Sequence, residues 1–82
     1  MVTLEKTSAN SHTLQIGHKE IHFSYETPIA FHDGTRIFVR QNAWGPTTGK
    51  HLNSIDGGDA LARANRYPGD EFERMLKTEF NL

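Results

Sequence analysis

The spacing of apolar residues changes near Asn42, and this change restricts the fold more than any other feature of the chain. Before it, apolar and polar residues alternate with a period of two, which is typical of half-buried strands. After it, apolar residues recur three and four positions apart, which is typical of amphipathic helices. Strands followed by helices predict an α+β domain. We expect a meander of about four antiparallel strands, then two or three short helices packed on one face of the sheet.

The first half of the chain carries the strand signals. Turns are expected at Gly17-His18 and at His32-Asp33-Gly34, where glycine or aspartate tolerates the backbone conformation of a tight turn. Pro28 cannot donate a hydrogen bond, so the strand that contains it starts there or lies at an edge. The strands are expected near Leu14–Ile16, Ile21–Tyr25, Ile29–Phe31 and Thr35–Gln41. Residues 1–11 are expected to form a flexible N-terminal arm or an edge strand, and residues 12–82 a single α+β domain.

The second half carries the helix signals. Thr47 is expected to be the N-cap of the first helix, and Gly57-Gly58 to end it. Asp59 is expected to cap a short helical turn. Asp70-Glu71 should begin a last helix, because acidic side chains suit the positive end of the helix dipole. The apolar side of this last helix consists of Phe72, Met75, Leu76 and Phe80.

Length and composition exclude several classes of protein. The chain has 82 residues and no cysteine, so a small core must hold it together without disulfides or a Cys-based zinc finger. Nine basic and ten acidic residues nearly balance, which argues against a basic duplex-binding module. No apolar run reaches the ~20 residues of a membrane-spanning helix, so we expect a soluble protein of the cytoplasm. Because so small a core leaves apolar strand faces uncovered, we expect a homo-oligomer, most simply a homodimer.

The segment Trp44–Leu52 looks like a phosphate-binding loop but departs from it at two points. Gly45 and Gly49 are separated by three residues, where that loop needs four, and His51 stands where the loop carries the Ser or Thr that holds Mg²⁺. We therefore predict a turn that opens a helix, with no nucleotide binding and no cofactor.

Two motifs stand out beyond these patterns. They are Tyr25-Glu26-Thr27-Pro28-Ile29-Ala30-Phe31 and, after a strand, Trp44-x-x-Thr47-Thr48-Gly49-Lys50-His51-Leu52-Asn53. Together they resemble a family of short uncharacterised proteins found mainly in bacteriophages and prokaryotic genomes. The resemblance covers about residues 20–56 and brings no established activity or catalytic residues. It implies a context, because small phage proteins of this kind commonly bind host or phage machinery, including defence systems. A phage-encoded protein of this family would act in the host-cell cytoplasm.

His18, Glu20 and His22 are spaced at i, i+2 and i+4, so in a regular strand they point to one face. Two imidazoles and a carboxylate are ligands that zinc or iron accepts. The alternative is a solvated polar face, because alternate strand residues lie ~6.6–6.8 Å apart and a metal must close those gaps. The three residues are weak metal candidates, and we predict no bound metal. His51, on the apolar side of its helix, is expected to be a core residue.

Arg36, Phe38 and Arg40 share one face of a predicted strand. Two guanidinium groups beside an aromatic ring form a platform of the kind that sheets use to bind single-stranded nucleic acid. The alternative is that protein covers Phe38, while the arginine stems pack around it and their charges pair with carboxylates. With Trp44 and Lys50, these three residues form the candidate partner-binding site.

These observations predict a small non-enzymatic accessory protein that binds a host or phage protein, with inhibition of a host defence system as one form of that activity. The alternative is a module for RNA or single-stranded DNA that uses the basic and aromatic sheet face, with Lys50, Arg63 and Arg66 adding positive charge. No catalytic residues are predicted, because no Ser-His-Asp arrangement can be assembled from the sequence.

Overall fold

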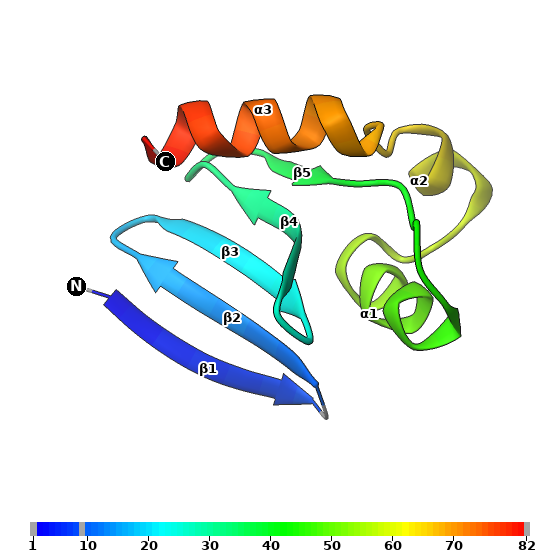
Figure 1. Cartoon of the computed structure of the whole chain (residues 1–82), viewed down its shortest axis with the longest axis horizontal. Coiled ribbons are helices and arrows are strands. Elements are labelled where there is room, and N and C mark those ends of the chain that lie inside the picture. Colours follow the sequence, from blue (N-terminus) through cyan, green and yellow to red (C-terminus); the bar gives the residue numbers. More distant parts are fainter. Residues whose placement is uncertain (1, 9, 82) are drawn as a thin grey trace. The chain divides into compact units, whose positions relative to one another are not determined.

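A computed structural model describes residues 2–8 and 10–81 of the chain, and the predicted α+β class is confirmed (Figure 1). The elements in chain order are β1 (Val2–Ser8), β2 (Ser11–Ile16), β3 (Lys19–Ser24), β4 (Thr27–His32), β5 (Ile37–Val39), α1 (Pro46–Asp56), α2 (Ala60–Ala64) and α3 (Gly69–Phe80). The sheet has five strands rather than about four, in the order β1-β2-β3-β4-β5. The additional strand is β1. The chain forms two compact units, residues 1–37 and 38–82.

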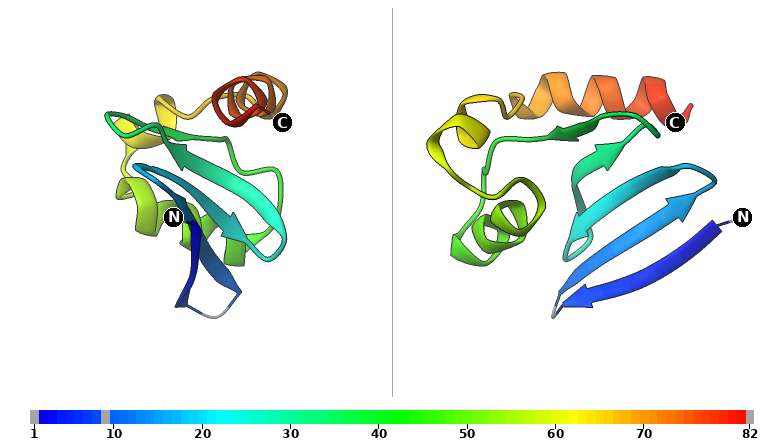
Figure 2. Two further views of the ribbon diagram at one scale, coloured as in Figure 1. Left: turned by 90° about the vertical axis from the view of Figure 1, so that its left-hand side faces the viewer. Right: turned by 180° about the vertical axis from the view of Figure 1, so that it is seen from behind.

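The first unit contains the antiparallel meander of β1 to β4, seen from two further sides in Figure 2. Leu4 lies opposite Leu14, Leu14 opposite Ile21, and Ile21 opposite Phe31. Residues directly opposite one another share a face, so these side chains form one apolar row across the strands. The turn at Gly17 is confirmed, with φ of 63° at the glycine.

The turn after β4 is also confirmed, and an aspartate organises it. The Asp33 carboxylate accepts hydrogen bonds from the backbone N–H groups of Thr35 (2.8 Å) and Arg36 (2.7 Å). Gly34 follows Asp33 with φ of 102°, a conformation that glycine adopts without strain. The aspartate and the glycine therefore act together to reverse the chain before β5.

The strand predicted over Thr35–Gln41 is wrong in length, because β5 contains only Ile37–Val39. Beyond Val39 the backbone pairs with another segment of the second unit. Tyr67 N–H donates to the Val39 carbonyl, and Gln41 N–H donates to the Tyr67 carbonyl, both at 2.8 Å. Arg40 thus lies in an isolated parallel bridge with Tyr67 rather than in a longer β5.

The predicted N-cap of the first helix is also wrong. The N-cap is Gly45, which provides no side-chain cap, and Pro46 occupies the first helical turn. Proline suits this position because its φ is already helical and its missing N–H would have no partner there. Thr47 therefore lies inside the helix. The predicted end is confirmed: Gly57 has φ of 87° and its N–H donates to the Asn53 carbonyl.

The other helix signals are confirmed. Asp59 caps α2 by accepting a 2.8 Å hydrogen bond from the Ala62 N–H. Helix α3 has Asp70 and Glu71 in its first turn. Within the described ranges 2–8 and 10–81, no helix is long and apolar enough to cross a membrane.

Each unit has its own buried apolar residues. The first unit contributes Ile21, Ile29, Ala30 and Phe31; the second contributes Val39, Leu52, Phe72 and Leu76. Packing of the helices on one face of the sheet and a single domain over residues 12–82 both stay predictions.

Candidate functional site

Arg40 is the best-enclosed charged residue of the predicted binding site. Its side chain is only 9% exposed. The guanidinium carbon lies 4.5 Å from the centroid of the Trp44 ring and 5.8 Å from that of the Phe72 ring. Both distances are within the range of cation–π attraction. Two aromatic rings therefore hold the positive charge of Arg40 inside the second unit.

Polar contacts to the Arg40 guanidinium are few. Its Nη1 lies 3.7 Å from Glu73 Oε1, which is too long for a strong hydrogen bond. Its Nε is buried, and none of the residues in the described part of the chain accepts a hydrogen bond from it. A Cβ atom placed on Gly69 would overlap Nη2. The absence of a side chain at Gly69 therefore lets the guanidinium reach the start of α3.

Trp44 presents the aromatic surface of this site to solvent. The residue remains 45% exposed while the Arg40 guanidinium packs on its ring. A short turn positions its backbone, because Trp44 N–H donates a 2.9 Å hydrogen bond to the Asn42 side-chain oxygen. Trp44 then leads through Gly45 into α1. The indole is therefore supported from the protein side and accessible from the solvent side.

Phe38 packs against an aromatic ring of the same unit. Its ring centroid lies 5.9 Å from that of Tyr67, with 42° between the ring planes. Both residues are partly buried. Because the backbone of Tyr67 is hydrogen bonded to Val39 and Gln41, the Tyr67 ring is a fixed packing surface for Phe38.

The structure thus divides the predicted partner-binding residues. It brings Arg40 and Trp44 together. Arg36 is exposed in the turn between β4 and β5, and Lys50 is exposed in helix α1. Burial of Arg40 fits the alternative in which arginine stems pack within the protein rather than the exposed two-arginine platform. Sequence reasoning did not identify Gly69 as a residue of this site. The available signal was its position, because Gly69 comes directly before the acidic residues at the start of α3.

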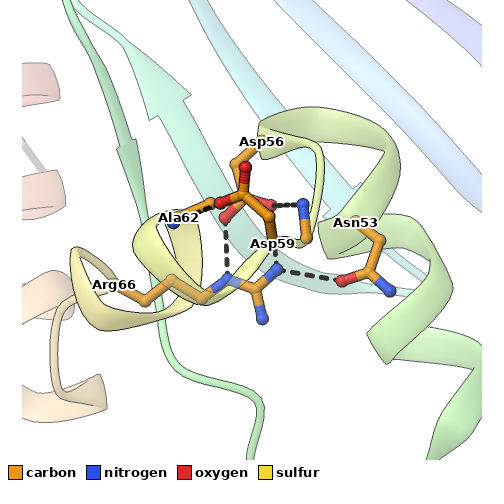
Figure 3. A network of polar contacts seen from close by, with 6 residues as sticks. Asn53, Asp56, Asp59, Ala62 and Arg66 are labelled. Atoms are coloured by element: carbon orange, nitrogen blue, oxygen red, sulfur yellow. Dashed lines mark hydrogen bonds and ion pairs between the residues drawn. The ribbon is translucent and has the colours of Figure 1, made fainter.

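A second buried arginine, Arg66, is fully engaged with an acidic partner (Figure 3). Its Nε and Nη2 donate to the two carboxylate oxygens of Asp56 at 2.7 and 2.9 Å, and Nη2 also donates to the Asn53 side-chain oxygen at 3.1 Å. The hydrogen bonds from Arg66 lower the pKa of Asp56, and the same pairing raises the pKa of Arg66. This bidentate pair ties the end of α1 to the segment after α2.

Of the three weak metal candidates, His18, Glu20 and His22, the structure brings Glu20 and His22 together. His22 Nε2 lies 3.5 Å from Glu20 Oε2, and His22 Nδ1 lies 2.9 Å from the Thr13 hydroxyl. His18 lies in the turn before β3, outside the regular strand. Burial lowers the pKa of His22 against the opposing effect of the Glu20 carboxylate, and His32 lowers it further.

No group of three His, Cys, Asp or Glu residues able to hold a metal occurs in the ranges 2–8 and 10–81. Glu20 and His22 are instead neighbours in a small polar cluster with Thr13. His51 is buried in α1, where its place on the apolar side of the helix led us to expect it.

The comparison with protein families gives one match. A model described as a family of unknown function (DUF8033) matches residues 2–74. No curated protein and no solved structure matches the chain. The match agrees with the expected uncharacterised family, whereas the bacteriophage context and the two-motif pattern stay predictions.

Proposed function

We propose that this chain, which belongs to the family of unknown function DUF8033, is a non-enzymatic protein that binds a partner protein at Trp44. The observation that carries the proposal is the Trp44 indole, nearly half exposed while the buried Arg40 supports its ring. Tryptophan residues held in a fixed position contribute a disproportionate share of the energy at protein interfaces. Because Arg40 already packs on the indole before a partner binds, less side-chain entropy is lost on binding.

The distribution of basic residues favours a protein over a nucleic acid as the partner. Of the arginines that a nucleic-acid module would use, Arg40 is buried against aromatic rings and Arg66 is paired with Asp56. Arg36, Lys50 and Arg63 remain exposed in a chain with net charge −1. Few phosphate contacts are therefore available from the arginine and lysine residues of the proposed platform.

The resemblance to small bacteriophage proteins supports a partner from the host or the phage. A component of a host defence system is the first candidate, because such proteins commonly act there. Location in the host-cell cytoplasm belongs to the same proposal.

Capture experiments with Trp44→Ala test the proposal. Tagged wild-type chain is incubated with lysate of a prokaryotic host, treated with nuclease, and washed at roughly 0.15 and 0.5 M salt. We expect the wild type to retain a protein in both washes. Trp44→Ala should weaken that complex by about thirty-fold, the effect of losing a hot-spot residue worth ~2 kcal/mol. Leu61→Ala is the matched control, because Leu61 is an apolar residue of the same unit that is 72% exposed.

The proposal fails if Trp44→Ala and Leu61→Ala retain the captured protein equally well. It also fails if nuclease or the higher salt concentration removes all bound material, which would instead support the RNA or single-stranded DNA alternative. Circular dichroism melting of both variants shows that loss of binding does not reflect loss of folding.

A further inference from the structure

Strand β1 forms one edge of the sheet and is paired on one side only within residues 2–8 and 10–81. Its partner is β2, in a regular register from Val2 opposite Ile16 to Lys6 opposite His12, after which the register shifts. An unpaired edge presents a row of backbone N–H and C=O groups to any added strand. The part of β1 with regular geometry, Val2 to Lys6, is therefore the part that can accept one.

The apolar face of β1 lies beside a groove. Val2 and Leu4 are 64% and 63% exposed, and their cross-strand neighbour Ile16 is 36% exposed. Beside them lies an open groove of about 390 Å³, lined by Leu4, His12, Leu14, Phe23, Tyr25 and Glu26. Exposed apolar side chains next to an open strand edge favour association through both the backbone and the side chains.

We propose that β1 pairs antiparallel with β1 of a second copy of this chain, about a two-fold axis that places Leu4 opposite Leu4. The regular segment from Val2 to Lys6 is symmetric about Leu4. A two-fold axis there pairs every residue of the segment with one of the other copy: Leu4 with Leu4, Thr3 with Glu5, and Val2 with Lys6. This interface lies in the first unit and does not depend on partner binding at Trp44.

Charge excludes the registers centred at Glu5 and Lys6, and the alternation of faces excludes those centred between two residues. A two-fold axis at Glu5 places two carboxylates opposite one another, and an axis at Lys6 places two ammonium groups opposite one another. An axis at Thr3 pairs Val2 with Leu4, so no leucine lies opposite another leucine, and the mixture of charged Leu4 variants described below distinguishes this register from the Leu4 register. An axis between two residues pairs positions that point to opposite faces, so the apolar face of one copy would continue into the polar face of the other.

The side chains of β1 also fit a second copy of itself. In the Leu4 register, no like charges are opposed, and the two exposed leucines cover each other at the axis. The aliphatic stem of Lys6 lies over Val2 of the other copy while its ammonium stays in water. The groove beside Leu4 and Leu14 then borders the interface in both copies.

Light scattering and sedimentation of the full chain test this proposal. We expect the wild type to have twice the chain mass of 9.3 kDa at micromolar concentration. Leu4→Lys and Leu4→Glu should each weaken dimerisation at least about tenfold, because each places like charges opposite one another at the axis. Leu61→Lys, at an exposed position of the other unit, should leave the dimer intact.

Mixing the two charged variants distinguishes this register from all others. An equimolar mixture of Leu4→Lys and Leu4→Glu should recover the dimer, because a lysine then lies opposite a glutamate. Recovery also shows that both variants are folded. A monomeric wild type, dimers that both variants retain, or a mixture that stays monomeric would each overturn the proposal.

Discussion

At the scale of single residues, Arg40 shows how an arginine from a strand end becomes part of a small core. Its guanidinium contacts the rings of Trp44 and Phe72, while its nearest carboxylate oxygen, on Glu73, is 3.7 Å away. Burial of a charge with one long ion pair costs free energy, which the cation–π contacts offset in part. Arg40 therefore contributes to the structure mainly by packing on the aromatic rings and less through its ion pair.

Gly69 and Arg40 should be energetically coupled. Gly69→Ala places a methyl group where the Arg40 Nη2 lies, and the two aromatic rings restrict movement of the guanidinium. We expect a loss of about 1–3 kcal/mol in the free energy of unfolding, although alanine is the better helix former. In an Arg40→Leu background the same change should be neutral or stabilising. Urea unfolding of the two single variants and the double variant gives the coupling energy, and additive effects would contradict the close packing of these residues.

The ion pair between Asp56 and Arg66 should make stability depend on pH. The pKa of Asp56 is lowered from 3.8 in the folded state, so between the folded and unfolded pKa values the unfolded chain binds more protons. The contribution of the pair is therefore complete above the unfolded value and is lost as pH falls through the folded value. Asp56→Ala, which leaves the Arg66 guanidinium with its hydrogen bond to Asn53 but without its carboxylate, should cost about 1–3 kcal/mol at neutral pH.

Urea unfolding at about pH 7 and about pH 3 measures this effect. The difference in stability between wild type and Asp56→Ala should shrink at the lower pH. Asp33→Ala should show a change in the same direction, because backbone hydrogen bonds from Arg36 and Thr35 lower the pKa of the exposed Asp33 carboxyl. An equal difference for Asp56→Ala at both pH values would show that the ion pair does not set the pH dependence.

At the scale of elements, the start of α1 gives a direct test of local structure. Gly45 is the N-cap and Thr47 is an exposed residue within the helix. Thr47→Ala should therefore change the free energy of unfolding by no more than about 0.5 kcal/mol. Thr48→Ala should cost more, because Thr48 is 5% exposed. Thermal unfolding of the two variants measures both effects. A loss of ~1 kcal/mol for Thr47→Ala would instead indicate that Thr47 is the N-cap, as the sequence suggested.

Local signals predicted these elements well where the signal and the structure depend on the same few residues. Asp33-Gly34, Gly57 and Asp59 form the expected turn, helix end and cap because the hydrogen bonds of each reach no further than four residues along the chain. The end of β5 could not be predicted this way. It is set by hydrogen bonds to Tyr67, a residue far along the chain with no pattern linking it to Val39.

The candidate site could also be predicted only in its local features. Trp44 and Arg40 carry the residue types expected of a binding surface, and the sequence places them close together. The contact of Arg40 with Phe72 and Gly69 depends on how α3 lies within the second unit, and local sequence patterns do not contain this information. This long-range packing is what makes Arg40 a buried support for the indole rather than an exposed contact.

At the scale of the whole molecule, self-association through β1 has a consequence for thermal stability. When folded chains associate and unfolded chains do not, mass action raises the melting temperature with protein concentration. A rise of about a hundredfold in concentration above the dissociation constant is worth ~2.7 kcal/mol per dimer, which is about half of that for each chain. We expect the melting temperature of the wild type to rise over such a range, and that of Leu4→Lys to rise less. Gly69→Ala should lower the melting temperature at every concentration but keep the dependence, because Gly69 lies in the second unit. Scanning calorimetry of the three chains provides the measurement, and a wild-type melting temperature that does not change with concentration would contradict assembly through β1.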